Sequence, residues 1–127
     1  MSQPSPTDAL PVLAVAEQLL AALDEPGAAV LVAPPGTGKT TGVPPLLAER
    51  PWARGARIVV VEPRRLAARA AASRMAAVSG TRLGDRVGYS VRGERRVGPA
   101  TRIEVVTEGL FLRRLYSDPS LVGVAAV

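Results

Sequence analysis

The chain has 127 residues, of which 16 are Lys or Arg and 11 are Asp or Glu, so its formal net charge is +5. This length allows one domain at most. The absence of cysteine and histidine excludes disulfides, thiolate or imidazole metal sites and a Ser-His catalytic pair within the chain. The positive charge favours polyanionic partners such as nucleic acid, although an arginine-rich genome would give the same excess.

The N-terminal residues Met1–Asp8 are polar, contain prolines and lack the basic region of a signal peptide. No apolar stretch approaches the roughly 20 residues that span a bilayer, so we expect a cytoplasmic protein without a membrane partner. Leucine and alanine at helical spacing predict a helix over Pro11–Leu23, which the Asp-Glu-Pro-Gly sequence at 24–27 ends. We assign residues 1–23 to a lead-in and helix, and 24–127 to a separate domain.

An apolar run without helical period, Ala28–Val32, predicts a strand that is buried on both faces. It leads into a small-x-x-x-x-Gly-Lys-Thr loop that contains the only lysine of the chain, Lys39. A compact ammonium on a flexible stem can reach the β- and γ-phosphates of a nucleotide, whereas a planar guanidinium cannot. The backbone N–H groups of such a loop form an anion site, and the Thr40 hydroxyl is suited to hold Mg²⁺.

This loop is therefore the predicted ATP site. Lys39 and Thr40 are its expected catalytic residues, and Thr40 is the expected metal ligand. The predicted nucleotide-binding residues of the loop are Ala33, Pro34, Pro35, Gly36, Thr37, Gly38, Lys39, Thr40 and Thr41.

The rest of the chain alternates apolar strand patterns with helical patterns. Pro44 and Pro45 predict a kink in the helix that follows the loop, or a late start of that helix, and Gly80 is expected to end a long alanine-rich helix. Strands are predicted at 57–62, 87–92, 103–107 and 121–127, and helices at 64–78 and 108–116. Strands alternating with helices predict an α/β fold, a parallel sheet flanked by helices.

The last apolar run, 121–127, reads as a buried strand. In P-loop NTPases an apolar strand ending in Asp supplies the carboxylate that organises Mg²⁺. Here the apolar run is present without its carboxylate. We therefore expect the sheet to be incomplete at the C-terminus, and the catalytic acids to lie just beyond Val127.

These segments together resemble the first RecA-like domain of superfamily 2 DExH helicases, and among them the bacterial HrpB-type ATP-dependent helicases. Ala33–Thr41 resembles motif I, Glu62–Ala68 motif Ia, Val87–Arg92 the V-G-Y-x-[IV]-R strand, and Thr107–Gly109 motif Ib. Motif I alone is shared by many unrelated NTPases, but the four segments in this order are much more specific. The resemblance implies a RecA-like P-loop NTPase fold and an ATP-dependent RNA helicase that uses ATP and Mg²⁺.

By this resemblance motif I binds ATP with Mg²⁺, while motifs Ia and Ib hold the RNA backbone. The implied RNA-binding residues are Arg64, Arg65, Thr107 and Gly109. Arg64 and Arg65 follow the carboxyl end of a predicted strand, where α/β sheets bind ligands, and guanidinium groups suit phosphate. Arg74 occupies the place of the family's arginine that stacks on the adenine.

The chain also departs from the family pattern. It contains no D-E-x-H sequence, no motif III and no second RecA-like domain, so we expect these residues alone to be inactive. One alternative is a small P-loop kinase with Arg92–Arg96 as its lid, although Pro63-Arg64-Arg65 stands where a kinase would need an acidic base. Another alternative is a non-catalytic fragment that binds nucleotide or RNA.

Overall fold

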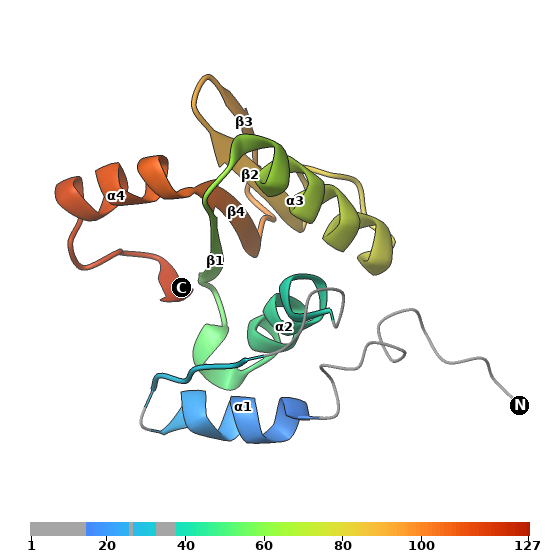
Figure 1. Cartoon of the computed structure of the whole chain (residues 1–127), viewed down its shortest axis with the longest axis vertical. Coiled ribbons are helices and arrows are strands. Elements are labelled where there is room, and N and C mark those ends of the chain that lie inside the picture. The colour runs from blue at the N-terminus through green and yellow to red at the C-terminus, as the bar shows by residue number, and fades with distance from the viewer. Residues whose placement is uncertain (1–14, 26, 33–37) are drawn as a thin grey trace, which may run out of the picture. The chain divides into compact units, whose positions relative to one another are not determined.

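The computed structural model of the chain describes residues 15–25, 27–32 and 38–127. It divides into two compact units, Met1–Val43 and Pro44–Val127, which are described separately below (Figure 1). The predicted boundary after Leu23 stays a prediction.

The first unit contains helix α1 (Ala16–Asp24) and the beginning of helix α2 (Lys39–Ala48). α1 ends at Asp24, within the predicted stop signal, and its backbone becomes extended at Glu25. The predicted start at Pro11 lies outside the described residues. α1 has no fully buried residue.

The prediction of a buried strand over Ala28–Val32 is wrong for this structure. These residues belong to no strand, and Val30 and Val32 are 91% and 90% exposed. A continuous apolar run is buried when it pairs into a parallel sheet whose two faces are covered by helices. No strand pairs with residues 28–32 in the described part of the chain, and the two valines stay exposed.

Of the two alternatives predicted for the next helix, the late start is wrong, because α2 begins at Lys39 and includes both Pro44 and Pro45, and the kink stays a prediction. Gly38 precedes α2 with a φ of 89°, a conformation that other residues rarely adopt. Proline fixes φ near a helical value, so its cost within a helix is the missing N–H and the crowding of the preceding turn. α2 accommodates that cost without ending.

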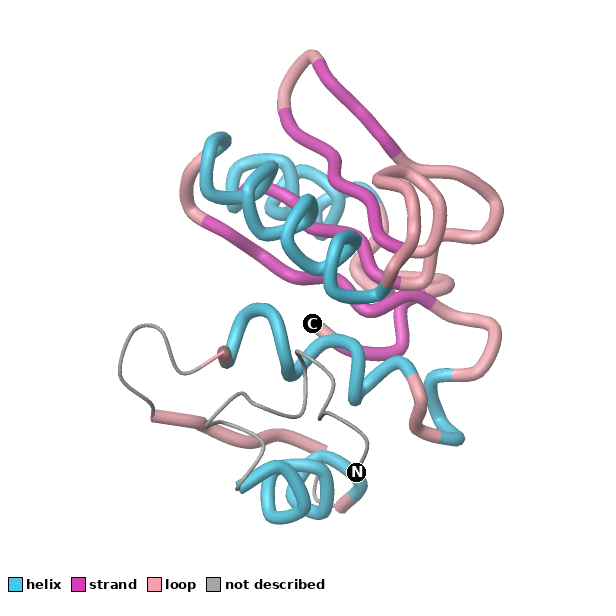
Figure 2. The backbone as a smooth tube through the Cα atoms, turned by 90° about the vertical axis from the view of Figure 1, so that its right-hand side faces the viewer, coloured by secondary structure: helices cyan, strands magenta, loops and turns pink. Residues whose placement is uncertain are grey.

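The second unit is built on a five-stranded sheet in the order β3-β2-β4-β1-β5 (Figures 1 and 2). The strands are β1 (Arg57–Glu62), β2 (Val87–Val91), β3 (Glu94–Arg96), β4 (Ile103–Thr107) and β5 (Val124–Ala126). β1 pairs in parallel with β4 and β5, and β2 pairs in parallel with β4. The predicted α/β fold is confirmed, and a short 3-10 helix, η2 (Pro51–Ala53), precedes β1.

β3 makes the sheet mixed, because it runs antiparallel to β2. A two-residue turn, Arg92-Gly93, joins the two strands, and Gly93 has a φ of 80°. The sequence predicts no strand over residues 94–96, and Arg92–Arg96 enters only as the lid of the kinase alternative. Charged side chains are typical of an edge strand, which explains why this strand has no apolar pattern.

Two helices lie on opposite faces of the sheet (Figure 1). α3 (Arg65–Ser79) packs its buried side against β1, β2 and β4. The buried residues of α3 are Ala68, Ala72, Met75 and Ala76. Gly80 ends this helix with a φ of 67°, as predicted. α4 (Glu108–Ser117) contacts β4 and β1 from the other face.

Parallel pairing brings the carboxyl ends of β1, β4 and β2 together. Glu62 at the end of β1 is paired with Thr107 at the end of β4, and Ser90 of β2 is paired with Val106. The starts of α3 and α4 and the Arg92-Gly93 turn therefore lie at one edge of the sheet. We call this the carboxyl edge.

Candidate nucleotide and nucleic-acid sites

The nucleotide loop is described from Gly38 onward, and Ala33, Pro34, Pro35, Gly36 and Thr37 lie outside the described residues. The Gly38 carbonyl accepts the Gly42 N–H at 2.6 Å, which forms the first turn of α2. Lys39 is exposed, Thr40 half-buried and Thr41 8% exposed.

The start of α2 has the properties of an anion site. The first N–H groups of a helix have no acceptor within that helix, and the first turn of α2 contains no acidic side chain. These N–H groups, the helix dipole and the Lys39 ammonium all favour a phosphate. The Thr40 hydroxyl adds one oxygen donor, which fits Mg²⁺ because that ion takes its other ligands from phosphate and water.

The carboxyl edge contains a cavity of about 430 Å³. One wall comes from the end of β4 and the start of α4, and the other from the end of β2 and its turn. The lining residues are Val91, Arg92, Gly93, Thr107, Gly109, Leu110 and Arg113. The structure thus brings together two of the four predicted RNA-binding residues, Thr107 and Gly109.

The two predicted arginines lie at the same edge but do not line the cavity. Arg64 is exposed and immediately precedes α3, and Arg65 is the first residue of that helix. Arg65 donates to a carboxylate oxygen of Glu94 on β3 at 3.4 Å, and Arg69 of α3 lies 3.7 Å from the same oxygen. Arg65 is therefore partly neutralised by a carboxylate that Arg64 does not share.

Glu94 also accepts a hydrogen bond from the Tyr89 hydroxyl. This bond and the neighbouring guanidinium groups lower the pKa of Glu94, and the same bond raises the pKa of Tyr89. The ring of Tyr89 in turn lies under the Arg69 guanidinium, 5.8 Å from it. Glu94 is therefore ionised at neutral pH and holds two arginines close to the carboxyl edge.

Two basic residues that line the cavity, Arg92 and Arg113, were not predicted as RNA contacts, and both are exposed. The sequence places Arg92 at the end of the predicted strand 87–92 and Arg113 within the predicted helix 108–116, with no RNA contact assigned to either. A sequence signal was present, because Arg92 ends the V-G-Y-x-[IV]-R segment next to a glycine. The sequence did not show that Arg92 lies at this edge, because its place there depends on the two-residue turn between β2 and β3.

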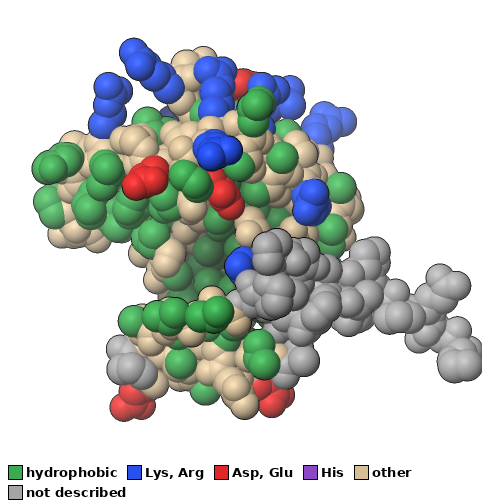
Figure 3. Space-filling view, in the orientation of Figure 1, with side chains coloured by type: hydrophobic (Ala, Val, Ile, Leu, Met, Phe, Trp, Pro, Cys, Tyr) green, Lys and Arg blue, Asp and Glu red, His purple; other side chains and the backbone are tan. Residues whose placement is uncertain are grey.

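Arginine side chains dominate this part of the surface, as Figure 3 shows over the region of β3 and the start of α3. The exposed arginines of this region are Arg64, Arg65, Arg69, Arg92, Arg95, Arg96 and Arg113. Glu62 and Glu108 lie at the same edge and offset part of this charge. The balance remains positive, as a phosphate-binding surface requires.

Arg74 lies on the exposed side of α3, and its assignment to the adenine stays a prediction. Over the described ranges, no helix combines the length and apolar character needed to cross a membrane.

No family model matches the chain. The chain is 48% identical to the ATP-dependent RNA helicase HrpB of Escherichia coli (strain K12) over 118 residues, which are 93% of this chain and 14% of that protein. A crystal structure of the Escherichia coli DEAH/RHA helicase HrpB is 47% identical over 91% of the chain, with a TM-score of 0.85. A crystal structure of the E. coli DExH-box NTPase HrpB is 46% identical over 98% of the chain, with a TM-score of 0.86. The chain spans about one seventh of these relatives and is similar, over nearly all of its own length, to a segment of an HrpB helicase.

Proposed function

We propose that this chain is the ATP-binding part of an ATP-dependent RNA helicase, which couples ATP hydrolysis to translocation on nucleic acid or to its unwinding. The observation that carries the proposal is the pairing of Glu62 with Thr107, which aligns the segments after β1 and β4 at one basic edge. The 48% identity to a protein named ATP-dependent RNA helicase supports the same function. The cytoplasm is the proposed location.

In the proposed nucleotide site, Lys39 neutralises the phosphate charge that develops during phosphoryl transfer, and the N–H groups at the start of α2 hold the same phosphates. Thr40 would hold the Mg²⁺, which supplies charge neutralisation at the β- and γ-phosphates. Arg74 is the proposed contact of the adenine.

In the proposed RNA site, Arg64 and Arg65 contact backbone phosphates, while Thr107 and Gly109 offer a hydroxyl and backbone N–H groups. Arg92 and Arg113, on opposite walls of the cavity, extend this set. Contacts of this kind hold the backbone without reading the base sequence. Binding should therefore depend strongly on salt and weakly on sequence.

We also propose that hydrolysis needs acids outside these 127 residues, because no D-E-x-H sequence occurs among them. The kinase alternative is less favoured, because residues 94–96 of its proposed lid form a strand paired with β2. Transfer of phosphate to a small acceptor would support the kinase. RNA binding without hydrolysis in the complete protein would support a non-catalytic role.

The test is RNA-stimulated phosphate release by the complete protein, with Lys39→Ala and Arg64→Ala compared. Lys39→Ala should abolish release while RNA binding without nucleotide is retained. Arg64→Ala should keep basal hydrolysis and weaken RNA binding and stimulation. Basal hydrolysis that does not respond to RNA, together with an unchanged RNA affinity in Arg64→Ala, would contradict the proposal.

A further inference from the structure

A buried carboxylate lies three residues before the end of β4. The side chain of Glu104 is 1% exposed. It points away from α3, because the next residue, Val105, is paired with Tyr89, whose ring lies under Arg69 of α3, and successive strand residues alternate between faces. A buried carboxylate stays ionised only when charge and hydrogen bonds compensate its lost hydration.

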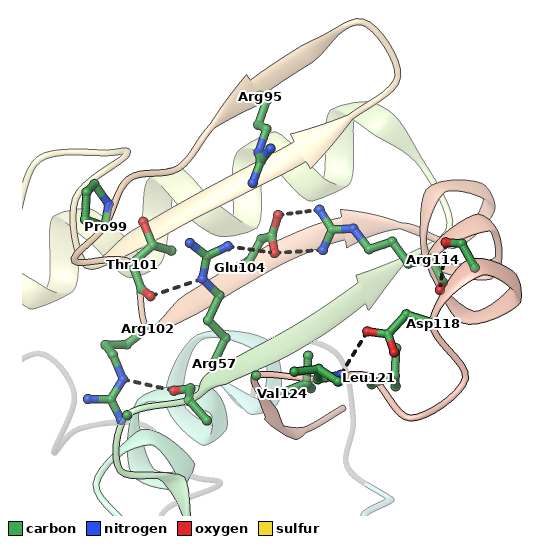
Figure 4. Close-up of a pocket in the computed structure, with 15 residues that line it drawn as sticks. Arg57, Arg95, Pro99, Thr101, Arg102, Glu104, Arg114, Asp118, Leu121 and Val124 are labelled. Atoms are coloured by element: carbon green, nitrogen blue, oxygen red, sulfur yellow. Dashed lines mark hydrogen bonds and ion pairs between the residues drawn. The ribbon is translucent and has the colours of Figure 1, made fainter.

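Three side chains provide that compensation, as Figure 4 shows for Arg114 and Arg57. Arg114 of α4 donates from Nη1 to Oε1 at 2.8 Å and from Nη2 to Oε2 at 2.7 Å. The Ser90 hydroxyl of β2 donates to Oε2 at 2.5 Å, and Arg57 of β1 donates to Oε1 at 3.3 Å. Burial alone raises the pKa of Glu104, but the bonds from Arg114 and Ser90 outweigh it and hold that pKa below its ordinary value.

Apart from the half-buried Leu110 and Phe111, few side chains of helix α4 are placed to fix its orientation. None of its residues is fully buried, and its N-cap residue, Thr107, makes no side-chain capping bond. Leu112 and Leu115 are 46% and 37% exposed, and Tyr116 is 87% exposed. The paired bonds from Arg114 to Glu104 are therefore the best-defined side-chain contact between α4 and the sheet.

The two elements that Glu104 joins carry the two walls of the cavity at the carboxyl edge. α4 provides Gly109 and Arg113, the neighbour of Arg114. β2 runs from Ser90 to the turn that begins at Arg92. A single oxygen, Oε2, accepts from both Arg114 and Ser90, so the carboxylate connects α4 to β2 in addition to the pairing of β2 with β4.

We propose that Glu104 is a positioning residue for RNA binding: through Arg114 and Ser90 it holds α4 and the β2–β3 turn at the separation that lets Arg113 and Arg92 engage one RNA backbone. The RNA part of this inference rests on the proposed function.

The deciding variant is Glu104→Gln, because its change in charge and its loss of positioning have opposite expected effects on RNA affinity. It makes the protein more positive, so electrostatics alone predicts tighter binding to a fluorescein-labelled single-stranded poly(U) oligonucleotide. Loss of positioning predicts binding about tenfold weaker, the equivalent of one charge-assisted hydrogen bond. It also predicts a log–log salt slope that is shallower by about 0.7 for each RNA phosphate that the variant no longer binds.

Measurements should use the complete protein, with unchanged circular dichroism as the criterion of folding. If Glu104→Gln does not fold, the double variant Glu104→Gln with Arg114→Met replaces it, because it removes the charge of both partners of the paired bonds. Arg57 then keeps its bonds to the carbonyls of Thr101 and Gly98. Arg82→Met is the matched control for the removed arginine, since Arg82 is exposed in the loop before the amino end of β2. The control should bind almost as the unaltered protein does.

Hydrogen exchange tests the position of α4 without RNA. In the variant, amides at 109–117 should exchange about tenfold faster, while those of β1 keep their rates. A folded variant with unchanged exchange in α4, or with equal or tighter RNA binding, would overturn the proposal. If the unaltered protein bound no RNA, the proposed function would fail instead, and the exchange rates would still decide whether Glu104 holds α4.

Discussion

The carboxylate of Glu94 restrains two arginines at the carboxyl edge, so its removal should strengthen RNA binding. Arg65 and Arg69 both lie within 4 Å of its Oε2, at 3.4 and 3.7 Å. Their side chains are 54% and 46% exposed, so phosphates can reach them once the carboxylate is neutralised. Glu94→Gln keeps the size of the side chain, and its amide oxygen can still accept the hydrogen bond from the Tyr89 hydroxyl.

The structure sets the size of the effect. Both distances exceed the 2.7–2.9 Å of a strong charge-assisted bond, so each arginine is only partly neutralised. For single-stranded RNA one added phosphate contact steepens the log–log salt slope by about 0.7. A full contact would thus raise affinity about fivefold at about 0.1 M salt, and a partial one about twofold. We expect Glu94→Gln to bind RNA about two- to fivefold more tightly, with a steeper slope.

The assay is fluorescence anisotropy of a labelled single-stranded RNA across a salt series at neutral pH. Asp85→Asn is the matched control, because it removes the same charge from a residue before the amino end of β2, away from the carboxyl edge. The gain should also disappear in Glu94→Gln with Arg65→Ala if Arg65 is the released contact. Equal changes in Glu94→Gln and Asp85→Asn would refute the reasoning, since the gain would then be net charge alone.

Lys39→Ala should lower ATP hydrolysis of the complete protein by about two to three orders of magnitude, with RNA binding retained in the absence of nucleotide; an equal loss of both in a phosphate-release and an anisotropy assay would contradict separate sites. Because the folded pKa of Glu104 lies below its unfolded value of 4.5, its ionised form should stabilise the fold above pH 4.5 and lose that effect as pH falls through the folded pKa. Urea unfolding should show this acid-dependent component in the unaltered protein, and Arg114→Met, which leaves the carboxylate with less compensation, should cost about 2–3 kcal/mol at pH 7. Gly88→Ala should disrupt the β2–β3 hairpin and lower the melting temperature, because a Cβ there would lie 2.1 Å from the Arg96 carbonyl oxygen; an unchanged melting curve would show that this backbone can move at no cost. The 127 residues alone should release no phosphate from ATP, and turnover that Lys39→Ala abolishes would contradict this. They should also be poorly soluble or partly molten, and a sharp melt from a monodisperse monomer would contradict that.

The central strands could be predicted from the sequence because burial on both faces leaves a continuous apolar run. β1 and β4 have the predicted bounds, 57–62 and 103–107. The same rule failed for Ala28–Val32, which has the same apolar pattern but no paired strand in the described structure. An apolar pattern shows that a segment could form a buried strand, but the segment becomes one only when it pairs with neighbouring strands.

The cavity at the carboxyl edge could be predicted only in part. Thr107 and Gly109 were found through motif Ib, which is local in sequence. Arg113 lines the same cavity because α4 presents it there, and Arg92 because of a hairpin whose second strand, β3, has no apolar pattern. Glu104 and Arg114 are ten residues apart, on different elements, so no local spacing rule would pair them.

The distribution of the arginines bears on whether the net charge of +5 reflects function or only composition. Some arginines satisfy the fold itself: Arg102 donates to the carbonyls of Ala53 and Ala56, and Arg57 and Arg114 compensate Glu104. A compositional bias would populate such positions and the general surface alike. The residues around the carboxyl edge differ, because exposed arginines such as Arg64 precede α3 at the positive end of its dipole, where cations are unfavourable. An arginine whose charge does not stabilise the fold is better explained by an anionic ligand than by composition. The Glu94→Gln and Arg64→Ala measurements test that explanation at this edge.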